Sequence, residues 1–465
     1  MTGKKYVFAD WSNVEPGYGT TWLDEKHPNI APSGVRLRVH KPVIEPQPVL
    51  LPEMPWEGTC INGYATFLKI DGKIRLWYEC FPDRTGYDDM DSLLAYAESD
   101  DGLHFTRPPL GLYSFRGSKE NNLLKKVHGT SVLYDAAAPV PERYKLVWVE
   151  YVHGDPRGHW CRIHGAVSPD GLHFTDLEEP VLDNPGDTQN ILDIDPGNGD
   201  YVLYTRQING YPVPRRSIAF SRSRDFRHFP EPRMLLNSDP ADPPDWDYYT
   251  SGYHPWPGAE NAYVMLIDMF HRVEDTFDIH LATSTDGVIW YRPLGREAYI
   301  PNGESGAFND KTICATKGIV DLGDGRWSLY LMCSRRGHND SREDYPWLPY
   351  GGYWRALLRE DGFISLSAAE KGEFHTAPLR FTGAPLRVNA AIPNHGCLRV
   401  GIFDLKTEAP VTGYTVADCD RLERDRVWQT VTWRGNGDLS GFAAEEKRYR
   451  LYFELYKTDL YAFSI

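Results

Sequence analysis

The stretch YAESDDGLHFTRP at residues 96–108 recurs, with small changes, three more times along the chain. The copies are GAVSPDGLHFTDL at 165–177, AFSRSRDFRHFPEP at 219–232 and LATSTDGVIWYRP at 281–293. Each copy is a short run of apolar or alternating residues, a tight turn containing Asp, and an aromatic residue, which is the pattern of a β-hairpin. The aromatics Phe105, Phe174, Phe229 and Trp290 recur roughly every 55–70 residues, the length of four short strands with turns, so the repeat predicts the blades of a β-propeller.

Further strand pairs lie between the hairpins and complete the expected blades. Examples are RYKLVWVEYV at 143–152 and NAYVMLIDMF at 261–270, and an earlier pair, NGYATFLKIDGKIRLWYECF at 62–81, precedes the first hairpin. Counting these pairs predicts five blades. The last blade is expected to end near GGYWRALLRED at 351–361, or to be closed by the N-terminal KYVFADW at 5–11, because closure hides the edges of a sheet.

The repeated phrase stops near residue 360, and the pattern changes. Short β-rich runs separated by polar turns follow, among them TAPLRFTGAPLRVNA at 376–390 and KRYRLYFELYKTDLYAFSI at 447–465. This spacing favours a β-sandwich of about 100 residues. The sequence therefore predicts an all-β chain, with a five-bladed propeller over 1–358 and a C-terminal β-sandwich over 359–465.

Charge and hydropathy exclude several classes of partner. The formal net charge is −15 and no run of Lys or Arg accumulates, so nucleic acid and anionic membranes would be repelled. No segment approaches the ~18 consecutive apolar residues of a membrane span, and the N-terminal residues lack the apolar core of a signal peptide. A cytoplasmic location is expected, or a periplasmic or secreted one if a leader has been removed.

The seven cysteines are scattered and none forms a CxxC pair. Buried, reduced thiols in strands such as WYECF at 77–81 are the expected outcome, with no disulfide framework and no zinc site. Asp-rich loops leave room for a structural Ca²⁺, but no EF-hand pattern supports one, so no cofactor and no metal ligand is assigned.

The order of the motifs resembles a known superfamily. Repeated S-x-D-G-x-x-[FW] hairpins followed by a sandwich are similar to the five-bladed glycoside hydrolases of the invertase and levanase type and their arabinan- and xylan-degrading relatives. The motifs PWEG (55–58), GSKENN (117–122), PERYK (141–145), DPPDWDYY (242–249) and DLYAFSI (459–465) most resemble a bacterial group of that architecture whose chemistry is uncharacterised. The Asn-Asp-Pro-Asn-Gly opening of invertases is absent, and WEGTCINGY (56–64) stands in its place.

The resemblance implies an active site in the central funnel, where the innermost strands begin and side chains from distant segments meet on one rim. Glycosidic hydrolysis needs one carboxyl group as acid and a second as base or nucleophile. The candidates at the starts of the blades are Glu57, Asp187, Asp247 and Asp310.

Each of these carboxylates also has a structural alternative. Asp187 could cap a turn, Glu57 could be a solvated loop residue, and Asp247 could belong to a packed loop. The aromatic neighbours of Asp247 favour an acid through desolvation, whereas Lys311 beside Asp310 favours a base or nucleophile. In contrast, the repeated Asp101, Asp170, Asp225 and Asp286 are interpreted as turn residues, since a turn recurs and a catalytic group has no need to.

Substrate-binding candidates lie close to these carboxylates in the sequence. Aromatic residues would stack on sugar faces, or pack only against the rim, and the histidines and the cluster SRRGHND (334–340) would bind hydroxyls or an acidic sugar, or serve only as scaffold. The candidates are Trp56, His128, Trp246, Tyr249, His254, Glu304, Arg335 and His338.

No other catalytic signature competes, because the chain has no GxSxG, HExxH, P-loop or Rossmann motif. The sequence therefore predicts a glycosidase that releases a terminal sugar, with a carbohydrate as its partner. A non-catalytic carbohydrate-binding propeller, or a phosphorylase or lyase on the same scaffold, remains the alternative. The sugar, its linkage, the stereochemical outcome and the oligomeric state stay open.

Overall fold

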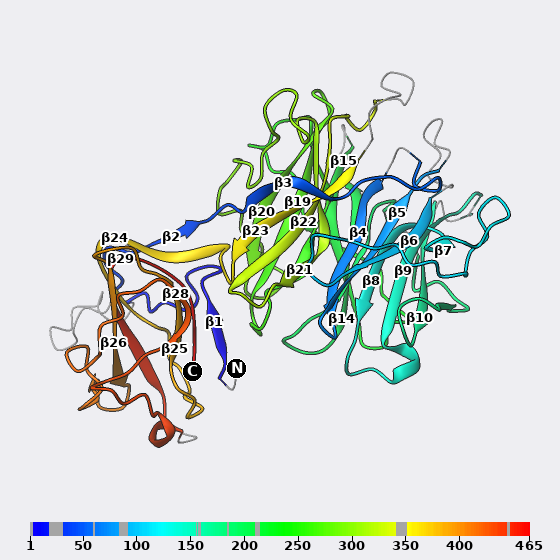
Figure 1. The fold of residues 1–465 in the computed structure, drawn as a ribbon. Helices are drawn as coiled ribbons and strands as arrows, with labels where there is room; N and C mark the ends of the chain where they lie inside the picture. Colours follow the sequence, from blue (N-terminus) through cyan, green and yellow to red (C-terminus); the bar gives the residue numbers. More distant parts are fainter. Residues whose placement is uncertain are drawn as a thin grey trace.

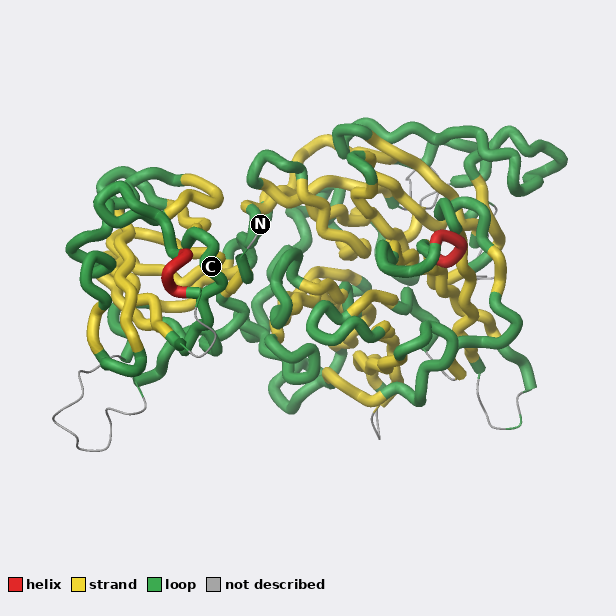
Figure 2. Tube along the Cα trace, turned by 90° about the horizontal axis from the view of Figure 1, so that it is seen from below, coloured by secondary structure: helices red, strands yellow, loops and turns green. Residues whose placement is uncertain are grey.

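The computed structural model describes residues 3–17, 31–58, 61–82, 92–154, 156, 160–183, 186–209, 214–340, 351–443 and 447–465. Nearly all regular structure in these ranges is β, as predicted, and only two short 3₁₀ turns, Val140–Glu142 and Ser440–Phe442, interrupt it (Figure 2). None of the helical segments described is long or apolar enough to span a membrane.

The strands between residues 43 and 359 form five antiparallel groups, which we number along the chain. Group 1 contains β4 (Ile61–Ile70), β5 (Lys73–Cys80), β6 (Leu93–Ser99) and β7 (Leu123–Lys126). Group 2 contains β8 (His128–Tyr134), β9 (Tyr144–Tyr151), β10 (Cys161–Ser168), β11 (Thr175–Asp176) and β12 (Leu182–Asp183). Group 3 contains β13 (Ile191–Ile194), β14 (Tyr201–Asn209), β15 (Arg215–Ser223) and β16 (Arg233–Leu236).

Group 4 begins with β17 (Trp246–Thr250) and β18 (Tyr253–Pro255), which both pair with the same neighbour and together form its first strand. Its second strand is β19 (Tyr263–His271) and its third is β20 (Thr276–Ser284). Group 5 contains β21 (Thr312–Asp321), β22 (Arg326–Ser334), β23 (Gly352–Arg359) and, as its outer strand, β3 (Val43–Leu50). The strand that completes group 5 is therefore β3, a segment that the sequence analysis did not single out.

The first strands of the five groups follow one another in a closed series of contacts. β4 contacts β8, β8 contacts β13, β13 contacts β18, β18 contacts β21, and β21 returns to β4. Polar side chains tie the strands of this series together. Lys317 Nζ donates to the carbonyl of Val132 at 2.8 Å, and Gln189 Nε2 donates to the carbonyls of Ala65 and Thr130. Segments far apart in the sequence thus meet around one centre.

The repeated phrase forms the same hydrogen-bonded turn each time. In the first copy, Asp101 Oδ1 accepts the backbone N–H groups of Leu103 and His104 at 2.8 and 2.9 Å, and Ser99 Oγ accepts the N–H of Gly102. The copies at Asp170 and Asp286 repeat these bonds, and Asp225 Oδ1 likewise accepts the N–H groups of Arg227 and His228. The interpretation of the repeated Asp as a turn residue is confirmed.

The C-terminal strands form one continuous eight-stranded sheet. Its strands are β1 (Lys5–Val7), β2 (Arg36–Val39), β24 (Ile364–His375), β25 (Arg387–Ala391), β26 (Cys397–Asp404), β27 (Ala409–Pro410), β28 (Arg426–Thr430) and β29 (Tyr449–Ser464). β29 is the central strand, since it pairs with β24, β25, β26 and β1. The change of sheet falls between β23 and β24.

The N-terminal strands belong to this C-terminal sheet (Figure 1). Of the two alternatives for closing the last blade, the segment at 351–361 does lie in group 5, as β23, whereas Lys5–Val7 pairs with Ala462–Ser464. Lys5 also joins the two parts of the chain, because its Nζ lies 2.8 Å from Asp361 Oδ1, which in turn accepts the indole N–H of Trp256 at 3.0 Å. Burial raises the pKa of Asp361.

Candidate functional site

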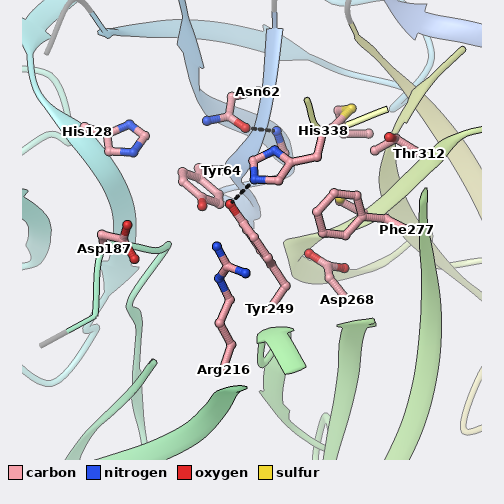
Figure 3. Close-up of a pocket in the computed structure, with 13 residues that line it drawn as sticks. Asn62, Tyr64, His128, Asp187, Arg216, Tyr249, Asp268, Phe277, Thr312 and His338 are labelled. Atoms are coloured by element: carbon pink, nitrogen blue, oxygen red, sulfur yellow. Dashed lines mark hydrogen bonds between the residues drawn. The ribbon is translucent and has the colours of Figure 1, made fainter. Parts of the chain in front are cut away.

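A pocket lies where segments of all five groups converge, and Figure 3 shows its side chains. The cavity measures about 170 Å³. Its polar lining side chains are Asn62, Tyr64, His128, Asp187, Arg216, Tyr249, Asp268, Thr312 and His338, and Gly63, Phe277, Cys314 and Met332 complete the wall. Two carboxyl groups, two imidazoles, one guanidinium and two phenols therefore face one small space.

Asp187 is the more accessible of the two carboxyl groups. It follows Gly186 just before β13, and its side chain is 29 % exposed. The guanidinium of Arg206 contacts Asp187 Oδ1 at 2.5 Å and also donates to the carbonyl of Tyr249. Burial opposes the charge of Arg206, but Tyr249 and Asp187 outweigh it and raise its pKa. The ion pair holds the Asp187 carboxylate at the wall of the pocket.

Asp268 lies in the opposite environment, within the apolar run VMLIDMF of β19. It is 2 % exposed, and its oxygens accept the hydroxyl of Thr250 at 2.5 Å and the N–H of Ala315 at 2.8 Å. Burial raises the pKa of Asp268 to about 7, because the apolar surroundings disfavour the charged form more than these two bonds and a third from the Cys314 thiol favour it. This carboxyl group keeps its proton at a pH where ordinary aspartates have lost it.

A buried carboxylate orients the imidazole of His128 at the pocket wall. His128 Nδ1 lies 3.0 Å from Oε2 of Glu79, which is fully buried in β5. The same carboxylate accepts the N–H and hydroxyl of Thr130 and the hydroxyl of Ser92. Glu79 therefore fixes the ring of His128 and its tautomer, as carboxylates commonly do for functional histidines.

Tyr249 contacts two other residues of the pocket lining, His338 and Arg216. Its hydroxyl lies 3.2 Å from His338 Nε2, and the Arg216 guanidinium lies 5.0 Å from the centre of its ring (Figure 3). Phe277 contacts the ring edge-on at 4.9 Å. Asp247 holds Arg216 in place, accepting its backbone N–H at 3.0 Å and its Nη1 at 2.7 Å.

Of the residues that the sequence analysis proposed, four line the pocket: Asp187, His128, Tyr249 and His338. Asp247 acts on the pocket only through Arg216, and its own side chain is buried. Trp246, its neighbour, packs its ring against His271 and His280.

Glu57 lies outside the pocket and is completely buried. Its oxygens accept Tyr78 Oη at 2.5 Å, Arg107 Nε at 2.7 Å and the N–H groups of Glu53 and Met54. Every lone pair of this carboxylate is occupied, so it fixes the loop before β4. Its neighbour Trp56 donates to Asn122 at 2.7 Å.

The remaining candidates also lie outside the pocket lining. Asp310 accepts the N–H of Gly306 at 2.7 Å within its own loop, and Glu304 in the same loop is exposed. Arg335 is exposed. His254 is buried beside Lys317, and burial lowers the pKa of His254 to about 3, so it is a neutral scaffold residue.

Sequence reasoning missed Asp268, Glu79, Arg216, Tyr64 and Asn62. Asp268 and Glu79 lie in the second strands of their groups, whereas the predicted carboxylates all came from the segments before first strands. A charged residue inside an otherwise apolar strand was the available signal, since such a group is rarely buried without a partner.

No family model matches the sequence. No curated protein matches it either. Among solved structures, the chain is similar to an N-acetylgalactosamine deacetylase from F. plautii (16 % identity over 74 % of this chain and 95 % of that one, TM-score 0.43). It is also similar to a β-fructofuranosidase of glycoside hydrolase family 32 from Bombyx mori (11 %, 90 % and 94 %, TM-score 0.43) and to a thermostable family-43 glycoside hydrolase (15 %, 66 % and 94 %, TM-score 0.46). Two of these three structures are glycoside hydrolases, and none of the three is more than 16 % identical to this chain.

Proposed function

We propose that the chain is a glycoside hydrolase that removes a terminal sugar in this pocket, with Asp268 as the general acid and Asp187 as the base or nucleophile. The observation that carries the proposal is the pair of carboxyl groups in opposite environments. Asp268 is buried with a pKa of about 7, whereas Asp187 is partly exposed and ion-paired with Arg206. Two carboxyl groups whose environments separate their protonation are what glycoside hydrolysis requires.

The chemistry assigned to each group follows from its surroundings. Protonated Asp268 would give its proton to the leaving glycosidic oxygen, so that the alcohol departs neutral. Asp187, which Arg206 orients, would either attack the anomeric carbon or remove a proton from an attacking water. His128, held by Glu79, and His338 would bind sugar hydroxyls.

The shape of the pocket supports a terminal sugar as the substrate. Its volume of about 170 Å³ is below the ~300–1,000 Å³ of sites that enclose drug-sized ligands. A single sugar ring suits this space better than an extended chain. Tyr249, Tyr64 and Phe277 supply aromatic surface for the faces of that ring.

The finer architecture belongs to the same proposal. We interpret the five antiparallel groups as the blades of a propeller, because their first strands contact one another in a closed series. The C-terminal sheet would fold over itself as a sandwich, with its buried hydrophobic cluster between the two halves. β1 and β2 would then belong to the C-terminal unit, although they precede the propeller in sequence.

The test is hydrolysis of aryl glycosides and of plant and marine oligosaccharides, with NMR of the first anomer released. Asp187→Asn and Asp268→Asn are expected to lower kcat/KM at least 100-fold. Asp310→Asn, a carboxylate outside the pocket, is the matched control and is expected to leave kcat/KM unchanged. Full activity in both pocket variants would refute the assignment, and sugar binding without turnover would favour the carbohydrate-binding alternative.

Phosphorolysis is a second candidate, and one observation favours it. Arg216, His128 and His338 line the same pocket as the carboxyl groups, and such a cluster can hold a phosphate nucleophile. The same panel would be run with and without inorganic phosphate. A sugar 1-phosphate that forms only in its presence, and is lost in Arg216→Gln, would replace hydrolysis with phosphorolysis.

A further inference from the structure

A second cluster of chemically capable side chains lies on the β19–β20 hairpin, away from the pocket lining. It consists of His271 at the end of β19 and Asp278 and His280 on β20. Asp278 and His280 are two residues apart on one strand, and His271 pairs with Thr276 across the hairpin. The alternation of side chains along a strand therefore places all three on the same face of the sheet.

The three side chains already have the spacing of metal ligands. Asp278 Oδ1 lies 3.0 Å from His271 Nε2 and 3.2 Å from His280 Nε2, and no two of the three ligand atoms are more than 4.8 Å apart. A tetrahedral zinc ion with bonds of about 2.0–2.1 Å separates its ligands by about 3.3 Å. Small rotations of the side chains would thus admit an ion between them.

The polar atoms of the cluster are poorly satisfied as they stand. Asp278 Oδ1 and both ring nitrogens of His280 are buried, and no group in the described residues forms a hydrogen bond of acceptable geometry with them. His280 is 1 % exposed. Asp278 Oδ1 and His280 Nε2 therefore contact each other at 3.2 Å only as an ion pair without good hydrogen-bond geometry. Buried polar atoms satisfied this poorly are uncommon, so the cluster has the capacity to bind a further ligand.

We propose that His271, Asp278 and His280 form a binding site for a divalent transition metal, with Zn²⁺ as the representative ion. Two neutral imidazoles and one carboxylate match the ligand preferences of zinc, and three protein ligands leave a fourth position for water. The inference is independent of the proposed glycosidase activity, because none of the three residues lines the pocket.

The site would also stiffen one wall of the pocket. Phe277, which lines the pocket, lies between Thr276 and Asp278, and its side chain points to the opposite face of β20. A metal that joins β19 to β20 at His271 would fix the end of this hairpin. Zinc is therefore expected to raise the melting temperature, since it binds the folded chain in preference to the unfolded one.

Trp246 supplies an internal reporter for the site. Its ring centre lies 4.9 Å from that of His271 and 5.2 Å from that of His280. A quenching ion such as Cu²⁺ bound by these histidines would lie close enough to lower the fluorescence of Trp246. Trp246→Phe would remove that part of the quenching and leave the ligands intact.

The experiment uses the full chain without an affinity tag, freed of metal by a chelator and titrated with ZnCl₂ by calorimetry. One Zn²⁺ per chain is expected, with the affinity reduced at least 100-fold in His271→Ala and in Asp278→Asn. His104→Ala is the matched control, because His104 is an exposed turn histidine that also contacts an aspartate; it is expected to keep full affinity.

The outcomes separate this site from others. The proposal would be overturned if zinc did not bind stoichiometrically, or if it bound equally well to both ligand variants. If substitution of His128 and His338 abolished zinc binding, the ion would lie in the pocket instead. Should the ligand variants fail to fold, the proposal is tested by comparing Cu²⁺ quenching of tryptophan fluorescence in the wild-type chain and in Trp246→Phe. Quenching that is equally strong in Trp246→Phe would refute the site.

Discussion

Replacing Asp268 by Asn should change the pH dependence of stability in a defined way. The pKa of Asp268 is raised from 3.8 to about 7 by burial. Between these values the folded chain keeps a proton that the unfolded chain has lost, so the contribution of Asp268 to stability falls as pH rises from about 4 to about 7 and stays low above that. Three pKa units at about 1.4 kcal/mol each correspond to about 4 kcal/mol.

The amide that Asp268→Asn introduces cannot ionise and can still bond to Ala315 and Thr250, with the direction of the Thr250 bond reversed. Its oxygen would accept the N–H of Ala315, and its N–H would donate to the hydroxyl of Thr250. About a quarter of this change lies below pH 4.5, so the free-energy difference between Asp268→Asn and wild type should shift in favour of the variant by about 3 kcal/mol between pH 4.5 and pH 8.5.

Urea unfolding of both proteins at four pH values in this range measures that difference. Asp101→Asn is the control that should show no pH dependence in this range. Burial raises the pKa of Asp101, but hydrogen bonds from His104 and Leu103 outweigh burial and lower that pKa, so the contribution of Asp101 to stability is lost only below about pH 4. A difference between Asp268→Asn and wild type that stays constant within about 1 kcal/mol from pH 4.5 to 8.5 would refute the elevated pKa, and with it the case for Asp268 as an acid.

Three further substitutions test other parts of the structure. Glu57→Gln breaks the buried ion pair with Arg107 and should lower the free energy of unfolding by about 3 kcal/mol in urea titrations. The kcat per folded molecule should stay at the wild-type value, and a selective loss of kcat would restore Glu57 as a catalytic candidate. Lys317→Met leaves the carbonyl of Val132 and the carboxylate of Asp193 without their buried cation, so a similar loss of about 3 kcal/mol is expected, and an unchanged urea midpoint would contradict it. Gly318→Ala places a Cβ 1.9 Å from the carbonyl oxygen of Phe67 at a φ of +128°, so calorimetry should show a lower melting temperature, and a wild-type value would show that β21 can shift.

The sequence predicted the recurring turns because their chemistry is local. Asp101 and its counterparts bond to backbone groups two and three residues away, and the phrase carries every atom that the turn needs. β3 and β1 could not be assigned in the same way. Val43–Leu50 completes group 5 next to Gly352–Arg359, and Lys5–Val7 pairs with the last strand, so both positions depend on partners some 300 or more residues away.

The same distinction between local and long-range contacts explains which residues of the candidate site were predicted. Asp187 was predicted from its place in a loop before a first strand, and it lies in the pocket. Glu57 has an equivalent place in the sequence, but its carboxylate binds Arg107, in the segment after β6, and Tyr78, in β5. Whether a loop acid faces a pocket or a buried cation is a matter of tertiary neighbours, which a single sequence does not reveal.

A structural role shared by three residues explains how Asp268 came to be buried at the pocket. Each lies in the second strand of its group and bonds to the backbone of the group that follows: Glu79 to the N–H of Thr130, Arg206 to the carbonyl of Tyr249, and Asp268 to the N–H of Ala315. These three bonds join neighbouring groups near the point where their first strands begin, and we call each of them a joint.

The joints and the pocket therefore draw on the same side chains. Glu79 accepts four donors and orients His128, and Arg206 holds Asp187, so two of the joints position a pocket residue without lining the pocket themselves. Asp268 is the joint that lines the pocket directly, and it has fewer donors than Glu79 to offset its burial. The bond to the N–H of Ala315 needs only an acceptor at position 268, which Asn also provides, whereas proton donation to a leaving group needs the carboxylic acid. Asp268→Asn thus separates the two roles: a stable, correctly folded and inactive variant is the result that the acid assignment requires.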